Sequence, residues 1–151
     1  MYLNMKKKLI LFAAALVVAA GAFLSVSCTD EFQVEKDQLY GKWIFPDSMP
    51  LDTVTGFNWS GVAMDIVKPD TIRVNCEGGY YLWTLRDNNV TATKTTYTIG
   101  ESYIIAFTIY ELSSDKMKIT GKCRYIYNGE NTERGDISCT LTKYVPPTPT
   151  K

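Results

Sequence analysis

Residues 117–125 read MKITGKCRY, and this stretch decides the fold of the chain. Met117 and every second residue after it are apolar, small or aromatic, whereas the residues between them are lysine, threonine and arginine. Because the side chains of a strand point alternately to its two faces, the pattern predicts a strand with one dry face and one wet face. Residues 137–142, ISCTLT, repeat the alternation. Such strands, joined by short antiparallel turns, build a meander.

The same β signal extends back to Leu39. Runs rich in threonine, valine, isoleucine and aromatic residues alternate with turn clusters, and no helical period lasts for ten residues. The predicted strands are 40–46, 60–68, 71–77, 79–86, 89–98, 102–112, 116–127 and 133–144. A ninth run, 51–57, is bracketed by Pro46 and Pro50 and interrupted by Gly56, so we interpret it as an irregular loop or lid.

Eight strands within residues 39–144 predict a closed barrel, because closure removes the unpaired edges of a sheet. The predicted fold is therefore all-β, a small antiparallel up-and-down eight-stranded barrel. A two-sheet β-sandwich is the alternative, although the turns are too short for its long connections. The wet faces carry lysine, arginine and threonine, where a membrane barrel needs an outward apolar band.

The start of the chain follows a different pattern. Three lysines, Lys6 to Lys8, precede the uncharged run 9–24, and small residues then lead to Cys28. This layout predicts a secretory signal peptide, and its end on a cysteine predicts the lipoprotein type. Cleavage before Cys28 and acylation, for instance by palmitate, would anchor the protein in a membrane. The alternatives are a spanning helix, for which the run is short, and an ordinary leader that leaves the Cys28 thiol unmodified.

These patterns divide the chain into four parts: a signal peptide at 1–27, a lipidated acidic tether at 28–38, a barrel at 39–144 and a proline-rich tail at 145–151. The leader removes three of the 16 basic residues, so 13 remain against 16 acidic residues, a net charge of −3. No basic patch indicates nucleic-acid binding. Histidine is absent, which excludes Ser-His-Asp and Cys-His catalysis and most zinc sites. We expect a protein that is not an enzyme and that uses no cofactor or metal.

The segment Leu39-Tyr40-Gly41-Lys42-Trp43 places a Gly-x-Trp at the start of the first predicted strand. This motif resembles the lipocalin and wider calycin signature, and the mature chain resembles the small lipocalin-like lipoproteins of Bacteroidetes-type bacteria. The resemblance implies that Gly41 lets the strand bend, that Trp43 plugs the closed end of the barrel and that Lys143 stacks over Trp43. The chain departs from full lipocalins in lacking their C-terminal helix and their Thr-Asp-Tyr motif.

Acidic residues directly follow the predicted lipidation site. Asp30 and Glu31 resemble the export signal of lipoproteins that are displayed on the outer face of the outer membrane. The resemblance therefore implies an outer-membrane, lipid-anchored protein at the cell surface. The alternative is that these two residues only keep the tether solvated.

A barrel of eight strands has an interior just wide enough for side chains or for one small ligand. Strand phase predicts that bulky residues line this interior and contact an apolar or amphipathic ligand: Trp43, Phe45, Tyr81, Trp83, Ile105, Phe107, Met117 and Tyr125. The alternative is that these side chains meet and fill the barrel. A second class of function is a surface interaction module that binds a glycan or a protein partner, such as a protease. Its contacts would be Tyr40, Phe57, Trp59, Tyr80 and Tyr110.

Three cysteines follow Cys28 in what is expected to be an oxidising compartment. Cys123 and Cys139 share the inward phase of neighbouring antiparallel strands, and they are the disulfide candidates. A two-residue turn at Asn128 and Gly129 would instead place Cys123 opposite Arg134. Pairing of Cys76 with either of the other two also stays open.

Overall fold

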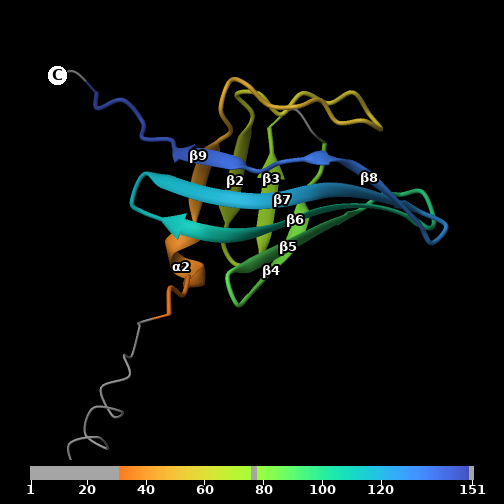
Figure 1. Ribbon diagram of the computed structural model, residues 1–151, viewed down its shortest axis with the longest axis horizontal. Coiled ribbons are helices and arrows are strands. Elements are labelled where there is room, and N and C mark those ends of the chain that lie inside the picture. The colour runs from red at the N-terminus through yellow and green to blue at the C-terminus, as the bar shows by residue number, and fades with distance from the viewer. Residues whose placement is uncertain (1–30, 76–77, 150–151) are drawn as a thin grey trace, which may run out of the picture. The chain divides into compact units, whose positions relative to one another are not determined.

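The structure is a computed structural model that describes residues 31–75 and 78–149, so the predicted leader and Cys28 lie outside the described residues. Residues Met1–Phe32 form one unit, of which only Glu31 and Phe32 are described, and both are exposed coil. The second unit begins at Gln33, before the predicted boundary at Leu39. A short helix opens it, and nine strands follow (Figure 1): α2 Lys36–Leu39, β1 Gly41–Ile44, β2 Ala63–Val67, β3 Thr71–Val74, β4 Tyr81–Arg86, β5 Asn89–Thr95, β6 Glu101–Leu112, β7 Lys116–Tyr127, β8 Glu130–Asp136 and β9 Cys139–Lys143.

The strands form a closed antiparallel barrel. Strands β1 to β7 pair in sequence order, β7 then pairs with β9, and β9 pairs with β1 to complete the ring. Strand β8 is an additional strand that pairs with the C-terminal half of β7. The predicted all-β fold with an eight-stranded barrel is therefore confirmed, and the sandwich alternative is wrong because β9 links β1 to β7.

Two predicted strands differ in detail. The run 51–57 holds only the bridge between Leu51 and Asn58, which agrees with its interpretation as a loop. The predicted strand 133–144 is two strands, β8 and β9, because β7 is long enough to pair with one over each half. Strand β8 follows a two-residue turn in which Asn128 and Gly129 have φ values of 49° and 84°. Such a turn matches the twist of a hairpin.

One end of the barrel is closed around Trp43. The indole Nε1 donates a hydrogen bond to the carbonyl oxygen of Leu39 at 2.8 Å, and both side chains are fully buried. The ammonium of Lys143 lies 5.0 Å from the centroid of the Trp43 ring. Gly41 has a φ of 127°, and a Cβ at this position would lie 2.9 Å from Cε of Lys143. The stacking of Lys143 over Trp43, implied by the resemblance, is thus present, and it needs a glycine beside it.

The interior next to this closed end is filled with side chains. Tightly buried residues from all eight strands of the ring form one hydrophobic core, and α2 contributes Leu39 to it. Cores of this kind pack at the density of organic crystals, with few voids larger than a water molecule. The barrel is therefore solid over most of its length.

The predicted cross-strand placement of Cys123 and Cys139 is wrong. Cys139 lies opposite Ile119, and Cys123 lies opposite Gly135. No disulfide joins these two cysteines. The two-residue turn fixes the register from Tyr127 backward, and a bulge on β8 then adds one residue, so Cys123 meets Gly135 rather than Arg134.

Candidate ligand-binding site

The residues predicted to bind a ligand belong to the core instead. Seven of them are at most 3% exposed and pack in the single hydrophobic cluster: Trp43, Phe45, Tyr81, Trp83, Ile105, Phe107 and Met117. Tyr125 is half-buried near the end of the barrel that lies opposite α2. None of the eight lines the large pocket of the structure. The alternative expectation, that these side chains meet and fill the barrel, agrees with their burial.

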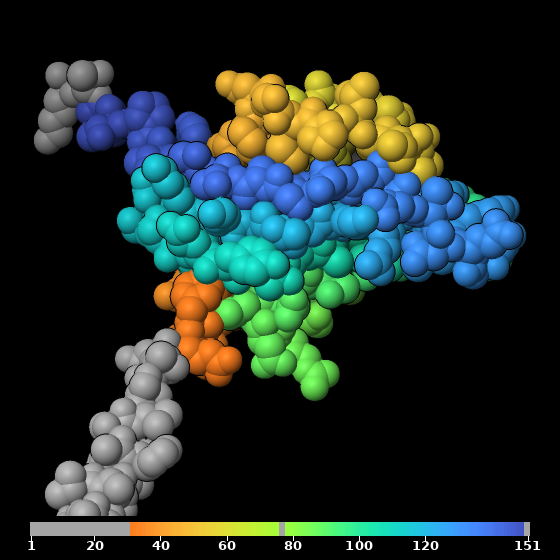
Figure 2. Space-filling model, viewed as in Figure 1, coloured from red at the N-terminus to blue at the C-terminus, as the bar shows by residue number. Residues whose placement is uncertain are grey.

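The large pocket lies at the end of the barrel opposite α2, with a volume of about 840 Å³. It opens where β4 begins and β5 ends, and the loop 51–58 and β8 form its other wall. Its lining residues are Thr55, Phe57, Gly78, Gly79, Tyr80, Leu82, Thr93, Lys94, Thr95, Thr96, Tyr97, Tyr103 and Arg134. Figure 2 shows the segment that contains the loop 51–58, in orange to yellow, packed along β8. This volume lies in the range of small-molecule sites in proteins.

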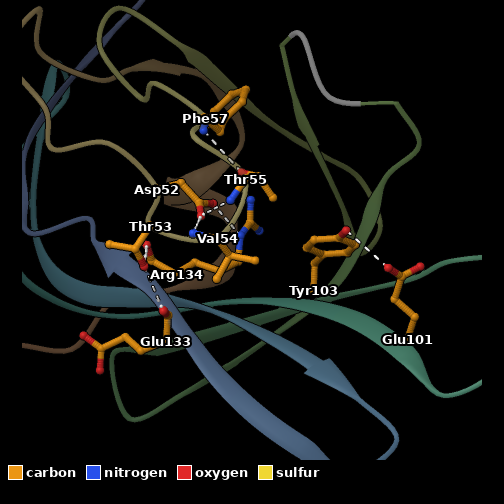
Figure 3. Close-up of polar contacts among 9 residues, drawn as sticks. All are labelled: Asp52, Thr53, Val54, Thr55, Phe57, Glu101, Tyr103, Glu133 and Arg134. Carbon is orange, nitrogen blue, oxygen red and sulfur yellow. Dashed lines mark hydrogen bonds and ion pairs between the residues drawn. The ribbon is translucent and has the colours of Figure 1, made fainter.

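A buried ion pair fixes the loop wall of the pocket. Nε of Arg134 lies 2.5 Å from Oδ2 of Asp52, and neither side chain is more than 1% exposed (Figure 3). The other carboxylate oxygen of Asp52 accepts hydrogen bonds from the backbone N–H groups of Val54 and Thr55, at 2.8 and 3.0 Å. The backbone N–H of Thr53 donates to the carbonyl oxygen of Arg134. The loop is therefore held to β8 by both side-chain and backbone bonds.

The surroundings of Asp52 keep it ionised. Burial acts to raise the pKa of the Asp52 carboxyl, but the N–H donors of Thr55 and Val54 and the charge of Arg134 outweigh it. The pKa of Asp52 therefore lies below its ordinary value of 3.8. The carboxylate is then a fixed negative charge at neutral pH, which holds the guanidinium of Arg134 in place.

Aromatic and cationic side chains meet on the floor of the pocket. The guanidinium of Arg134 lies 4.8 Å from the ring centroid of Tyr103, within the range of a cation–π contact. The ammonium of Lys94 lies 5.0 Å from the Tyr103 ring and 5.1 Å from the Tyr81 ring. The Tyr103 ring thus contacts two cations, which favours a defined orientation of the ring at the pocket floor.

Beside the floor, Glu101 collects hydroxyl donors. Its carboxylate accepts hydrogen bonds from Tyr125 at 2.9 Å, from Tyr103 at 3.4 Å and from Thr96. The Thr96 hydroxyl first, and then that of Tyr125, lower the pKa of Glu101, whereas the bond to Glu101 raises the pKa of Tyr125 to about 12. The rings of Tyr103 and Tyr125 lie 5.1 Å apart. This network joins the ends of β5, β6 and β7 next to the pocket.

The aromatic contacts proposed for an interaction surface divide into three groups by exposure: buried, exposed and half-buried. Trp59 is 2% exposed and packs against Phe45 and Phe57, each at 5.1 Å between ring centroids, so it forms no external platform. Tyr80 and Tyr110 are 56% and 58% exposed, at opposite ends of the barrel. Tyr40 and Phe57 are half-buried.

Sequence reasoning missed Arg134, Lys94 and Asp52. The inward phase read from Ile137 and Leu141 would turn Arg134 outward, but the bulge on β8 changes the phase and buries it. A bulge leaves no alternation signal of its own. For Lys94, strand alternation could have predicted an inward side chain, because Lys94 shares the phase of the buried residues Val90 and Ala92.

The chain matches no protein-family model, no curated protein and no solved structure. Among residues 31–75 and 78–149, no group of histidine, cysteine or acidic side chains is placed to hold a metal ion. The described part of the chain also contains no helix long and apolar enough to span a membrane.

Proposed function

We propose that this chain is a lipocalin-like lipoprotein, anchored through acyl chains on Cys28, whose barrel binds a small apolar or amphipathic ligand without chemical conversion. The observation that carries the proposal is the pocket of about 840 Å³, with exposed aromatic side chains, at one end of an otherwise solid barrel. The Gly41, Trp43 and Lys143 arrangement at the other end supports the lipocalin-like assignment.

The end of the barrel at which the chain enters is the end that the proposed anchor would precede. The described chain enters the barrel beside α2, where Val34 donates a backbone hydrogen bond to Asn88 in the β4–β5 turn. Tyr80 and Tyr97 line the pocket at the opposite end of β4 and β5. An anchor on Cys28 would therefore be joined to the barrel through the segment that enters beside the closed end. The proposed location is the outer face of the outer membrane.

Lipidation and ligand binding are tested separately. Labelled palmitate should be incorporated by the natural chain and not by Cys28→Ala, which would show the anchor. Native mass spectrometry of the full chain, purified from its own host, should show a retained small molecule. Tyr80→Ala should reduce the retained fraction. Tyr110→Ala removes an equally exposed tyrosine at the closed end and should leave that fraction unchanged. A protein that carries no ligand in any preparation contradicts the binding proposal.

A second candidate is a surface module that grips a glycan or a protein partner. The observation that favours it is a set of exposed apolar side chains at the pocket end of the barrel: Leu82 is 60% exposed, and Tyr97 and Ile99 are almost fully exposed. Co-purification of a stoichiometric protein partner that is lost in Ile99→Ser, with no retained small molecule, would favour this candidate.

A further inference from the structure

We infer that the ligand is a compact, ring-bearing molecule that stacks across the mouth of the barrel, and not a long-chain lipid threaded into it. This inference rests on the proposed ligand-binding function and names the class of ligand. It is carried by two independent observations, the filled interior and the chemistry of the pocket lining.

The interior formed by the described residues is filled with side chains, which leaves no channel for an alkyl chain among them. Directly inside the floor formed by Lys94 and Tyr103, the inward residues Tyr81, Ile105 and Cys123 are at most 1% exposed. They belong to the same hydrophobic cluster as Trp43 at the closed end. Insertion of a chain would have to displace packed side chains, and overpacking a core is destabilising. The ligand therefore binds above the floor.

The lining favours rings over chains. Four aromatic side chains reach the pocket from four segments, namely Phe57, Tyr80, Tyr97 and Tyr103. Leu82 is the single aliphatic side chain larger than threonine among the described lining residues. Aromatic side chains gain from offset or edge-to-face packing against another ring, beyond the area that they bury. An alkyl chain offers no ring and would gain only burial.

The polar groups of the lining suit substituents on a ring. Threonine hydroxyls come from both walls, Thr55 from the loop 51–58 and Thr93, Thr95 and Thr96 from β5 and the turn after it. Lys94 and Arg134 lie on the floor, in contact with Tyr103. Oxygen-bearing groups around the edge of a ring could accept hydrogen bonds from the hydroxyls of Thr93 and Thr95, while its faces contact the tyrosines.

The pocket is also organised in advance for stacking. Tyr103 is oriented by Lys94 and Arg134, and its hydroxyl donates to Glu101. Phe57 packs edge-on against the buried Trp59, with ring centroids 5.1 Å apart. Rings held in this way lose little freedom when a ligand binds, which improves affinity.

A matched pair of probes tests the inference on the full chain in an amphipathic polymer, with the empty polymer as the blank. Naphthalene-2-sulfonate and decane-1-sulfonate have the same number of carbon atoms and the same headgroup, and they differ in having rings or a chain. By isothermal titration calorimetry, we expect the naphthalene probe to bind with one site per chain and about tenfold more tightly than the decane probe. Decane-1-sulfonate that binds as tightly or more tightly would overturn the inference.

Two variants keep apolar volume and remove a ring. Tyr80→Leu and Tyr97→Leu should each weaken the naphthalene probe several-fold and leave the decane probe unchanged, whereas Tyr110→Leu at the closed end should change neither. Unchanged binding of the naphthalene probe in both pocket variants would also overturn the inference. Binding of neither probe contradicts the proposed function itself. Equally tight binding of both probes would contradict the ring-bearing ligand class and leave the proposed binding function standing.

Discussion

Asp52 and Arg134, 82 residues apart in the chain, form a buried ion pair that joins the loop 51–58 to the bulged strand β8. The pair supports one wall of the pocket, and Arg134 extends from it to the ring of Tyr103. A buried pair of this kind is costly to break, because removal of one partner leaves the other charge in a poorly solvated place.

The first prediction concerns stability. Asp52→Ala should lower the free energy of unfolding by about 3–5 kcal/mol, because it removes the carboxylate that pairs with the buried guanidinium of Arg134. Glu133→Gln is the control, since it removes an ion pair with Lys122 at 2.8 Å whose side chains are half-exposed. Such a surface pair contributes about 1 kcal/mol or less. Urea unfolding measures both, and equal effects would contradict the role given to the buried pair.

The second prediction concerns pH. The pKa of Asp52 is lower in the folded protein than its ordinary value, so the folded state favours the ionised carboxylate. The stabilisation is complete above about pH 4 and is lost as the pH falls through the folded pKa. The free energy of unfolding of the natural chain should therefore fall more between about pH 6 and about pH 3 than that of Asp52→Asn. Parallel pH profiles of the two proteins would show that Asp52 is not responsible.

The third prediction concerns the contact between β6 and β7. A Cβ on Gly121 would lie 2.5 Å from Cβ of Phe107, and still closer to the carbonyl oxygen of Ala106. Gly121→Ala should therefore destabilise the fold by about 1–3 kcal/mol, because two strand backbones must separate. Gly78→Ala, where a Cβ meets nothing within 4 Å, should change the unfolding free energy by less than about 0.5 kcal/mol. Chemical denaturation of both variants gives the comparison.

The fourth prediction concerns the closed end of the barrel. Lys143→Met keeps most of the apolar stem and removes the charge 5.0 Å from the Trp43 ring, so it should cost about 1 kcal/mol. Lys42→Met removes a similar contact with Tyr144, at 5.3 Å, on the exposed face of β1, and should cost less. Thermal unfolding at matched protein concentration tests the order of the two effects. A larger loss in Lys42→Met would contradict it.

The fifth prediction concerns the tyrosine cluster beside the pocket. The hydrogen bond that Tyr125 donates to the Glu101 carboxylate stabilises the protonated phenol and raises the pKa of Tyr125 to about 12. In Glu101→Gln, the neutral amide no longer attracts that proton in the same way, so the pKa of Tyr125 should fall toward 10. Titration of the tyrosine ring carbons by NMR, with Tyr125→Phe to assign the signal, measures the change. An unaltered pKa would mean that Glu101 does not hold this hydroxyl in solution.

Much of the fold could be predicted from the sequence, and the reason is that its signals are local. The alternation from Met117 to Tyr125 specifies a strand with one dry face, and β7 occupies this stretch. Proline and glycine mark the run 51–57 as a loop, and the structure confirms it. The contact of Trp43 with Lys143, implied by resemblance, also follows from strand phase once the barrel closes.

The candidate site could not be predicted in the same way. Inward phase identified Trp43, Phe45 and Trp83 correctly as interior residues, but phase does not tell a filled interior from a hollow one. That distinction depends on side-chain volumes from all eight strands at once.

By itself, the amino-acid sequence determined most of the strands and the dry face of strands such as β7, because a period of two needs only near neighbours. The tertiary structure alone decided that the cavity lies at the end opposite α2 and that Arg134 points inward to meet Asp52. The physical reason is that a single extra residue in β8 reverses the faces of that strand, and its cost is offset by a partner far away in the chain.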